Sequence, residues 1–455
     1  MKTYQDLLRV NQNTNDIMAF VRSVITEHKN TDLFKTAAIA NEYFKHKNVT
    51  INQYEKVLYK VTGGTVPDNY SANHKMANRF FYRFLIQENQ YSLGNGVSFK
   101  EKETSDKLGT KEKPFDNQMQ ALGIKALWGG VSFGFYNLDH IDVFSVLEFA
   151  PLFDELSGSI KAGVRFWQVA PDKPLRATLY ELDGYTDYLW LYKDTPISDD
   201  WIYIDRNKYG KQKKPYIMNV EKSIADGDEI IAEENYPTFP IVPLWANNEH
   251  QSEIVGMREQ IDAYDLIKNA TANDVDASII YWTLTNAGGM DDMDLAQFLD
   301  RLKRLHATTL DDDVQAEPHT VDIPIQSREA ILDRIEKDLY RDAMALNTET
   351  IASGAVTATQ IQASYEPLNA KADMYEYCLI DFINKILVLA GIDDEPTFTR
   401  SKIVNASEEI QVLNVSAPNL SEEYVTRKTL ELMGDGDKAD DMIEEMQADS
   451  IPSIE

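Results

Sequence analysis

The stretch NTETIASGAVTATQI, residues 347–361, is small, polar and almost uncharged, although 26% of the residues in the chain are charged. Long helical patterns lie on both sides of it. A plain connector between two helices needs only a few residues. The length and composition of the stretch therefore indicate a loop with a role of its own.

The helix before this loop is predicted to begin at Ser327, a residue type that favours the N-cap position. Its apolar residues recur at helical spacing on one face, and they are Ile331, Ile335, Leu339 and Ala343. The helix after the loop is predicted to begin at Thr357, because Gln360 completes a capping-box pattern, and to end at Gly391. At about 1.5 Å per residue it is roughly 50 Å long, with a kink expected at Pro367.

Another long helix is predicted earlier in the chain, from Ser252 to about Tyr281. Its apolar stripe has a 3-4-3 spacing and then continues, and its residues are Ile254, Met257, Ile261 and Tyr264, followed by Thr271, Val275 and Ser278. A helix of roughly 45 Å with one apolar stripe must bury that stripe, so we expect it to pack against a partner. The insert that follows, residues 282–325, is predicted to be compact and α/β, with a helix in DLAQFLDRLKRLHA (294–307).

The first half of the chain changes character near residue 130. Helical patterns occupy residues 14–30, 32–47 and 115–130, and the run at 76–99 is a further helix or apolar run that ends at Gly94 and Gly96. Short β-type runs separated by turn signals then continue to Trp245, and they include VSFGFY, DVFSVLEF, KAGVRFWQVA, RATLYEL, DYLWLY and DWIYI. At the other end of the chain, TFTRSKIVN (397–405) predicts a strand, and an acidic helical segment follows. The sequence therefore predicts an α+β protein with a mostly antiparallel sheet region.

The charge of the chain limits the kinds of partner. The formal net charge is −29, with 74 acidic against 45 basic residues. Nucleic-acid affinity rests mainly on Lys and Arg at phosphates, so the chain should repel nucleic acid. The single cysteine, Cys378, excludes an internal disulfide framework. No apolar segment of signal-peptide or membrane-spanning type is visible, so we expect a soluble protein made in a cytoplasm.

We find no catalytic motif. The phosphate-binding loop pattern G-x-x-x-x-G-K-[ST] and the zinc pattern H-E-x-x-H are both missing from the sequence, and the seven histidines lack metal-ligand spacing. Two acidic clusters could bind Mg²⁺ as in a nuclease or phosphotransferase, namely Asp291, Asp292 and Asp294, and Asp311, Asp312 and Asp313. Solvated acidic loops explain the same residues. We therefore predict no catalytic residue, no metal site and no cofactor, and favour a structural protein.

Several stretches carry a resemblance to a known family. They are NEYFKHKNVTI (41–51), ANRFFYRFLIQENQYSLGNGVSF (77–99), WGGVSFGFYNLD (128–139), AGVRFWQV (162–169), FPIVPLWANNEHQSEI (239–254), REQIDAYDLIKNATANDVD (258–276), ASGAVTATQI (352–361) and NAKADM (369–374). In this order they resemble the portal proteins of tailed bacteriophages, especially the family from phages of Gram-positive hosts. The chain departs from the family pattern at Val356-Thr357, where a larger aliphatic residue is expected, and at the early position of Pro367.

The resemblance implies a portal fold with a mixed α/β wing, a long-helix stem, a small α/β clip and a helical crown, assembled as a ring. The implied boundaries are 1–246 for the wing, 247–281 and 326–346 for the two stem helices, 282–325 for the clip, 347–356 for the tunnel loop, 357–391 for the long kinked helix, 392–419 for a wing strand and linker, and 420–455 for the acidic crown and tail.

The resemblance also implies a function and partners. The ring, usually of twelve subunits, would sit at one vertex of the capsid, as part of a virion whose components are made in the host bacterial cytoplasm. Double-stranded DNA would pass through its channel during packaging and ejection, without sequence-specific binding. Its protein partners would be the terminase large subunit, which hydrolyses ATP and docks on the clip, the head-completion or connector proteins, and the capsid and scaffolding proteins.

Three sets of residues take predicted roles in that assembly. The DNA-facing tunnel loop would use Thr348, Glu349, Thr350, Ser353 and Gly354. The stem helices would pack between subunits through Ile254, Met257, Ile261 and Tyr264. The clip would dock its partners through Arg301, Lys303 and Arg304, for which a solvated helix face is the other interpretation. An ordinary helix–helix connector is the alternative for the loop.

Two other function classes stay open at this point. One is the metal-dependent nuclease or phosphotransferase that the aspartate clusters would serve. The other is a β-rich adhesion or tail module of the virion that does not form a ring, although such a module does not explain two long helices that frame an insert.

Overall fold

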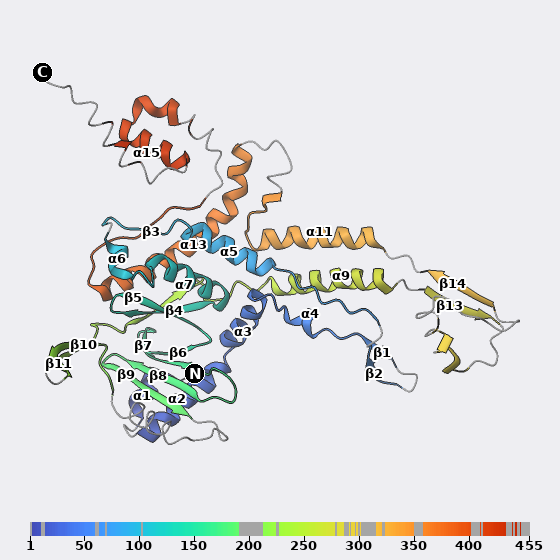
Figure 1. Ribbon diagram of the computed structural model, residues 1–455, viewed down its shortest axis with the longest axis horizontal. Coiled ribbons are helices and arrows are strands. Elements are labelled where there is room, and N and C mark those ends of the chain that lie inside the picture. The colour runs from blue at the N-terminus through green and yellow to red at the C-terminus, as the bar shows by residue number, and fades with distance from the viewer. Residues whose placement is uncertain are drawn as a thin grey trace.

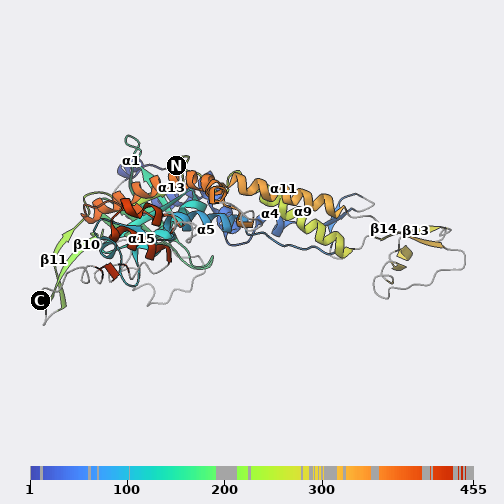
Figure 2. The same cartoon turned by 90° about the horizontal axis from the view of Figure 1, so that it is seen from above.

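The computed structural model shows a mixed α+β protein of elongated shape. A broad body carries a pair of helices that project from one side and end in a small hairpin (Figure 1). Figure 2 shows the same elongation from above. The structure describes residues 2–10, 14–59, 63–68, 71–101, 103–190, 213–223, 227–277, 280–285, 291, 293–295, 297–298, 301, 315–320, 324–349, 358–401, 410, 413–433, 439, 442–443 and 446.

One part of the body is a four-stranded antiparallel sheet covered by the first helices. The sheet has the order β6-β7-β8-β9, with β6 at Phe149–Phe153, β7 at Ile160–Trp167, β8 at Leu175–Glu181 and β9 at Gly184–Trp190. Helices α1 (Tyr4–Arg9) and α2 (Thr14–Lys29) pack on it. Val21 and Ile25 of α2 meet the alternating inward residues of the strands, such as Val164 and Leu179, in one hydrophobic cluster.

The larger core lies around a three-stranded antiparallel sheet of order β12-β4-β5, with β4 at Val131–Asn137, β5 at His140–Ser145 and β12 at Ile241–Trp245. The helices that contribute to this core include α3 (Asp32–Phe44), α5 (Phe80–Leu93), α7 (Phe115–Gly129) and α13 (Ala358–Ala390). Gly134 of β4 is needed where α13 crosses the sheet, because a Cβ there would lie 2.5 Å from the ring of Phe382.

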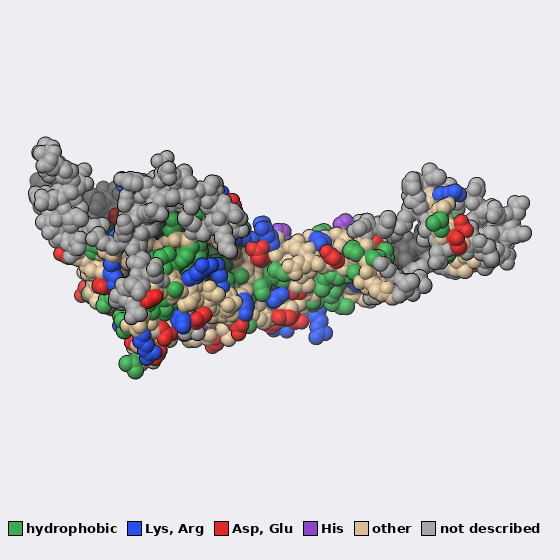
Figure 3. Space-filling view, turned by 90° about the horizontal axis from the view of Figure 1, so that it is seen from below, with side chains coloured by type: hydrophobic (Ala, Val, Ile, Leu, Met, Phe, Trp, Pro, Cys, Tyr) green, Lys and Arg blue, Asp and Glu red, His purple; other side chains and the backbone are tan. Residues whose placement is uncertain are grey.

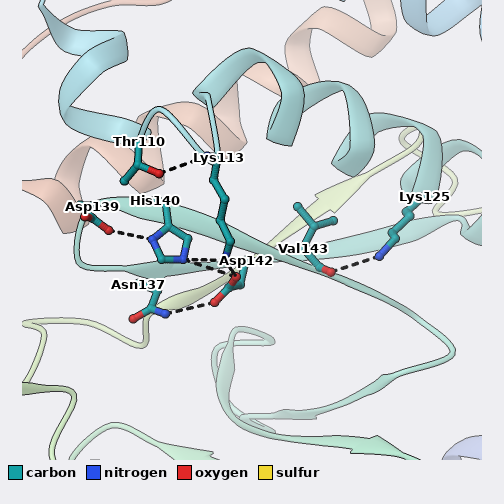
Figure 4. Close-up of polar contacts among 8 residues, drawn as sticks. All are labelled: Thr110, Lys113, Lys125, Asn137, Asp139, His140, Asp142 and Val143. Carbon is teal, nitrogen blue, oxygen red and sulfur yellow. Dashed lines mark hydrogen bonds and ion pairs between the residues drawn. The ribbon is translucent and has the colours of Figure 1, made fainter. Parts of the chain in front are cut away.

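A polar cluster ties the β4–β5 turn to the loop before α7 (Figure 4). Lys113 Nζ lies 2.6 Å from Asp142 Oδ1 and 2.9 Å from His140 Nε2, and Asn137 Nδ2 donates to the other oxygen of Asp142 at 3.1 Å. Burial opposes ionisation of Asp142, but the hydrogen bonds from Lys113 and Asn137 lower the pKa of that carboxyl below its ordinary value. The cluster fixes the start of the helix that supports the sheet.

Smaller elements lie in the body and along the projecting helices (Figure 1). Helices α4 (Val49–Gln53) and α6 (Thr104–Leu108) are short. Three antiparallel pairs are formed by β1 (Val57–Tyr59) with β2 (Thr65–Pro67), β10 (Ile217–Ser223) with β11 (Gly227–Glu234), and β3 (Val97–Ser98) with β15 (Thr397–Phe398). The 3-10 turn η1 (Ala417–Asn419) and helix α15 (Glu422–Met433) lie near the C-terminus.

The projecting part contains α9 (Arg258–Ala277) and α11 (Ile325–Asp342). The chain leaves α9, forms β13 (Ile280–Thr285), returns through β14 (Gln315–Thr320) and enters α11, so the hairpin caps the outer end of the helix pair (Figure 1). Seen from below, this part is much narrower than the body (Figure 3).

Most of the predicted elements that fall within the described residues are confirmed, and three predictions need correction. The run DWIYI (200–204) and most of the predicted helix 294–307 lie outside the described residues. The helix predicted from Ser252 to Tyr281 spans only Arg258–Ala277. It starts late because residues 253–257 form turns, with Gly256 at φ +86°, and it ends early because β13 follows. The run DVFSVLEF is not one strand but β5 and β6 joined by a turn. The strand predicted over 397–405 is two residues long within the described part of the chain.

Candidate functional site

The two projecting helices are antiparallel, and polar contacts at both ends fix their register. Near the hairpin, Arg328 Nη2 of α11 lies 2.7 Å from Asp274 Oδ2 of α9. Near the body, Gln260 Nε2 of α9 donates a hydrogen bond to Asp342 of α11. We call this pair of helices the stem. Its apolar contacts continue into the body, where Tyr264 meets Phe80 and Tyr340 meets Phe84 edge to face.

The buried stripe of α9 repeats every four residues and changes chemistry along the helix. Met257 and Ile261 belong to the main hydrophobic core, whereas Asp265, Asn269 and Asn273 continue the same stripe with at most 2% of their surface exposed. The sequence pattern instead predicted Val275 as the continuation, but that side chain is 52% exposed. The outer half of α9 is therefore buried through a polar face.

That polar face holds an extended segment of the chain in a ladder of hydrogen bonds. The backbone N–H of His74 donates to Asn273 Oδ1 at 2.7 Å, that of Met76 donates to Asn269 Oδ1 at 2.7 Å, and that of Asn78 donates to Asp265 Oδ1 at 3.0 Å. Asn269 Nδ2 donates back to the carbonyl oxygen of Met76 at 2.9 Å. The backbone N–H of every second residue of the segment thus donates to the side-chain oxygen of every fourth residue of the helix.

The two periods fit for a geometric reason. Two residues of extended chain advance about 6.6 Å, and four residues of an α-helix advance about 6.0 Å. The mismatch is about 0.6 Å per step, which three successive hydrogen bonds can absorb by small tilts. Side-chain oxygens at i, i+4 and i+8 of α9 can therefore replace the neighbouring strand that residues 74–78 lack.

The body supports the same face of α9 from α3 and α4. Asn48 Nδ2 donates to Asp265 Oδ2 at 2.5 Å, and Thr50 Oγ1 donates to Asp262 Oδ2 at 2.7 Å. Tyr43 OH also donates to Asp262. Burial raises the pKa of Asp265 above its ordinary value, while the hydrogen bonds from Asn48 and Asn78 act against that rise. The stem is thus fixed to the body by directional bonds as well as by apolar packing.

A buried triad of charges lies at the base of the stem. Lys371 Nζ of α13 lies 2.7 Å from Glu88 Oε2 of α5 and 2.7 Å from Glu253 Oε2, just before α9. It also donates to the carbonyl oxygen of Ala343, at the end of α11. Burial raises the pKa of Glu88 to about 7 although Lys371 opposes the rise. Burial alone would lower the pKa of Lys371, but the two carboxylates raise it.

Both flanks of the loop at residues 347–357 are anchored on α5. Before the loop, Gln87 brackets Leu346: its Nε2 donates to the Leu346 carbonyl at 3.0 Å and its Oε1 accepts from the Leu346 N–H at 3.0 Å. After the loop, Tyr365 of α13 stacks on Tyr91 of α5. Leu346, Tyr91 and Tyr365 share one small hydrophobic cluster with Leu368 and Ala372. The body therefore brings the two ends of the loop together.

The residues predicted for the loop fall partly outside the described chain. Thr348 and Glu349 are exposed, and the N–H of Glu349 donates to Asn347 Oδ1 at 3.0 Å. Thr350, Ser353 and Gly354 lie outside the described residues. Their DNA-facing role stays a prediction.

The residues predicted for inter-subunit packing of the stem lie inside the chain's own core. Ile254, Met257 and Ile261 are at most 4% exposed, and Tyr264 is half-buried. Side chains that are already covered within one chain have little surface left for a second chain. Intramolecular packing accounts for their burial, and the structure gives no support to an inter-subunit role.

The clip residues and the acidic clusters are only partly described. Arg301 is exposed, whereas Lys303 and Arg304 lie outside the described residues, so their docking role stays a prediction. Asp291 and Asp294 are exposed, and the backbone N–H of each donates to the carboxylate of the other. Asp292 and Asp311–Asp313 lie outside the described residues. Over the described ranges, no group of three or more His, Cys, Asp or Glu side chains is arranged to hold a metal ion. The helices in those ranges include none long and apolar enough to cross a membrane.

The family of the chain is decided by a match along nearly its whole length. The family model described as phage portal protein, SPP1 Gp6-like, matches residues 23–452. The chain belongs to this family of phage portal proteins. It is accordingly a structural component of the virion, at the capsid vertex, rather than an enzyme.

Individual relatives agree with this family. The portal protein of Bacillus phage SPP1 is 24% identical over 426 residues, covering 86% of this chain and 79% of the relative. The portal protein of Clostridium phage phiCD119 is 24% identical over 214 residues, and that match spans about half of each protein, 44% of this chain and 47% of the relative.

Solved structures of gene transfer agent particles also match. A chain from the neck of a native particle, computed with C12 symmetry, has a TM-score of 0.41 and 10% identity, covering 78% of this chain and 89% of that chain. A chain from the neck of an empty particle, computed with C6 symmetry, has a TM-score of 0.43 and 10% identity, covering 78% and 90%.

Proposed function

We propose that this portal chain assembles into a ring that forms the channel for packaging and ejection of double-stranded DNA. The family match over residues 23–452 carries the proposal. The shape of the chain supports it, because a broad body with a narrow projecting stem can be arranged around an axis with identical neighbours. Twelve subunits is the number that the family resemblance implies.

We assign the parts of the portal as follows. The body is the wing, α9 and α11 are the stem, and the β13–β14 hairpin at its outer end belongs to the clip. The loop that follows Leu346 is the tunnel loop, and α15 belongs to the crown. The anchoring of both loop flanks on α5 supports this assignment, because a loop that meets moving DNA needs a rigid base.

The charge of the chain suits a channel that DNA traverses without being retained. A cation on the channel wall would attract phosphate and slow a moving duplex. Glu349 is exposed at the start of the loop and repels phosphate, while the loop sequence beyond it holds no charged residue as far as Thr359. Solubility alone is a second reason for an acidic surface.

The clip is proposed to receive the terminase large subunit during packaging and the head-completion or connector proteins afterwards, with Arg301, Lys303 and Arg304 contributing. Capsid and scaffolding proteins would contact the wing. Replacing the three basic residues by Ala should weaken terminase binding most at low salt, because exposed charges are screened at high salt. If the variant and the original protein bind the terminase with equal affinity at low salt, these three residues do not belong to the docking site.

Two measurements test the function. Electron microscopy of the purified protein should show closed rings, and their absence together with a monomeric mass would overturn the proposal. In a packaging assay that measures nuclease-protected DNA per capsid, Glu349→Lys should slow packaging more at low salt than at high salt.

Gly354→Val tests the loop separately. It should leave rings intact but reduce packaging, because a β-branched side chain restricts the backbone and occupies the channel. If Gly354→Val and Glu349→Lys both form rings and package DNA normally, residues 347–356 are only a connector between two helices.

A further inference from the structure

An arm of the chain lies along the stem and keeps several large apolar side chains exposed within the described residues. We define the arm as residues 45–59, 63–68 and 71–79, which run from the end of α3 through the β1–β2 hairpin to the start of α5. Four of its large apolar side chains are 40–43% exposed, namely Tyr54, Val57, Leu58 and Met76. A two-stranded hairpin of three residues per strand is not stable by itself in water. The arm therefore needs a covering surface.

The arm is basic although the chain as a whole is acidic. Its described residues include five Lys or Arg and two Asp or Glu, a net charge of +3 in a chain of −29. Lys45 and Lys47 are exposed and Lys56 is half-exposed. Over the described ranges, none of these three lysines has an ion-pair partner within the chain. The cover that the arm needs should therefore carry negative charge next to apolar surface.

The stem carries such a surface on α11. Ile325, Glu329, Asp333 and Glu336 follow one another at helical spacing and share one face of the helix. Ile325 is 41% exposed, and Glu329 and Asp333 are exposed. Within the described residues, these three carboxylates form no ion pair, unlike Asp338, which pairs with Arg334 and Arg341 on another face.

The arm of a chain and the acidic face of the same chain do not meet. The arm binds α9 through Asp265, Asn269 and Asn273, whereas α11 binds α9 through Gln260 and Asp274. Neighbouring residues of a helix point about 100° apart. Asn273, which binds the arm, and Asp274, which binds α11, therefore lie on different faces of α9. Each subunit thus has a basic apolar arm on one face of the stem and an acidic apolar stripe on another.

We propose that the arm of one subunit packs on the acidic stripe of α11 in the neighbouring subunit. Lys45, Lys47 and Lys56 would pair with Glu329, Asp333 and Glu336, and the exposed apolar residues of the hairpin would cover Ile325. Two different surfaces on one chain make a heterologous interface, which closes into a ring when the rotation from one subunit to the next divides a full turn. This inference rests on the ring of the proposed function and names the surfaces that join its subunits.

The apolar content of the arm favours a protein partner over DNA. A DNA-binding surface places Lys and Arg at phosphates and gains little from exposed Val57, Leu58 and Met76. An acidic helix face with an exposed apolar residue at its outer end satisfies both features of the arm. Binding of the arm to DNA is the competing explanation, and the experiment below distinguishes it from binding to a neighbouring subunit.

A charge swap tests the pairing. The variant K45E/K47E/K56E should raise the protein concentration at which half of the chains are in rings by roughly tenfold at 50 mM salt, and the variant E329K/D333K/E336K should do the same. Combining all six changes should restore assembly to within about twofold of the original protein, because only a direct pairing is repaired by exchange of both signs. Mass photometry and electron microscopy measure the ring fraction.

The controls separate the possible failures. K35E/K111E/K161E changes the charge equally at exposed lysines of the body and should leave assembly unchanged. If the unmodified protein forms no rings, the proposed function fails and this inference fails with it. If it forms rings and the two triple variants form them equally well, only the inference fails. If the arm variant assembles normally but loses affinity for a DNA duplex at low salt, the arm contacts DNA and the inference is overturned.

Discussion

The two ends of α9 are buried in different ways. At the inner end, Met257 and Ile261 lie in the hydrophobic core of the body. At the outer end, Asp265, Asn269 and Asn273 occupy the same stripe of the helix and are buried equally well, but against the backbone of residues 74–78. One stripe of one helix therefore holds its neighbours by the hydrophobic effect at one end and by directional hydrogen bonds at the other.

The difference shows what each kind of burial contributes. Apolar packing depends on area and volume, and it tolerates substitutions of similar size. A hydrogen-bond ladder depends on matched donors and acceptors, and an unmatched partner loses free energy. The inner end of α9 thus supplies stability, while the outer end fixes which residues of the extended segment lie against which residues of the helix.

The largest effect is expected where a charge replaces an apolar residue at the inner end. Ile261→Asp should lower the free energy of unfolding by several kcal/mol, because it places an unpaired carboxylate in a core position with no exposed surface. Chemical unfolding measured by tryptophan fluorescence would show the loss, together with poor recovery of soluble protein.

Val275→Asp is the matched control for this substitution. It puts the same charge on an exposed face of the same helix and should change the free energy of unfolding by less than about 0.5 kcal/mol. If the Ile261→Asp protein unfolds at the same denaturant concentration as the original protein but forms no rings, then Ile261 packs between subunits, as the sequence analysis predicted.

A smaller effect separates the two chemistries directly. Asn269→Leu should lower the free energy of unfolding by about 2 kcal/mol, because it leaves the N–H and C=O of Met76 without their partners at a partly buried position. Ile261→Leu, a change of similar size at the apolar end, should cost less than about 1.5 kcal/mol. Hydrogen exchange should also speed up at the amides of residues 74, 76 and 78 in Asn269→Leu only. Equal costs for the two leucine variants would contradict the division of α9 into two chemistries.

The charge triad below the stem should make stability depend on pH. The pKa of Glu88 is raised to about 7 from an ordinary value of 4.5, so the folded protein binds this proton more tightly than the unfolded chain. The associated stability is complete below about pH 4.5 and is lost as the pH rises through 7. Glu88→Gln imitates the protonated acid, and its melting temperature should exceed that of the original protein at pH 8, by the equivalent of about 1–2 kcal/mol.

At pH 5 the two proteins should melt within a degree or two of each other. Glu253→Gln is the control, because it changes the other carboxylate of the same triad. A melting temperature of Glu88→Gln that falls below the original protein at pH 8 would mean that the ionised pair with Lys371 stabilises the base of the stem.

The smallest effect is expected at the ion pair that closes the outer end of the stem. Asp274→Asn removes one charge from a pair with Arg328 in which both side chains keep more than a fifth of their surface in water. Such partly exposed pairs contribute about 0.5–1 kcal/mol, and less as salt rises. Stability measured at 50 and 500 mM salt should differ for the original protein and converge with that of the variant at high salt.

The sequence predicted the elements whose signal is local. The apolar repeat and end signals placed α11 and α13 within a few residues of their observed bounds. The early limit of α9 could not be read in this way, because Ile254 and Met257 keep the helical spacing although the chain there makes turns around Gly256. An apolar repeat records which residues are buried, and it does not show whether the backbone between them is helical.

The polar half of the site was missed because its partners are distant in sequence. Asn269 and Met76 are 193 residues apart, and Glu88, Glu253 and Lys371 come from three separate segments. One local signal was available: Asp265, Asn269 and Asn273 extend the line from Met257 and Ile261 at intervals of four. Polar residues in register with a buried stripe indicate a buried backbone partner, although they do not name it.

The anchoring of the loop ends has a consequence for how this protein can change over time. Because Gln87 and Tyr91 hold the chain on both sides of residues 347–357, the cost of closing that loop grows only with the logarithm of its length, by about 0.6 kcal/mol for each doubling. Insertions and deletions there leave the core contacts of α5 and α13 untouched. The bore of a channel built from such chains could therefore be adjusted in evolution by changing loop length alone, independently of the selection that maintains the fold.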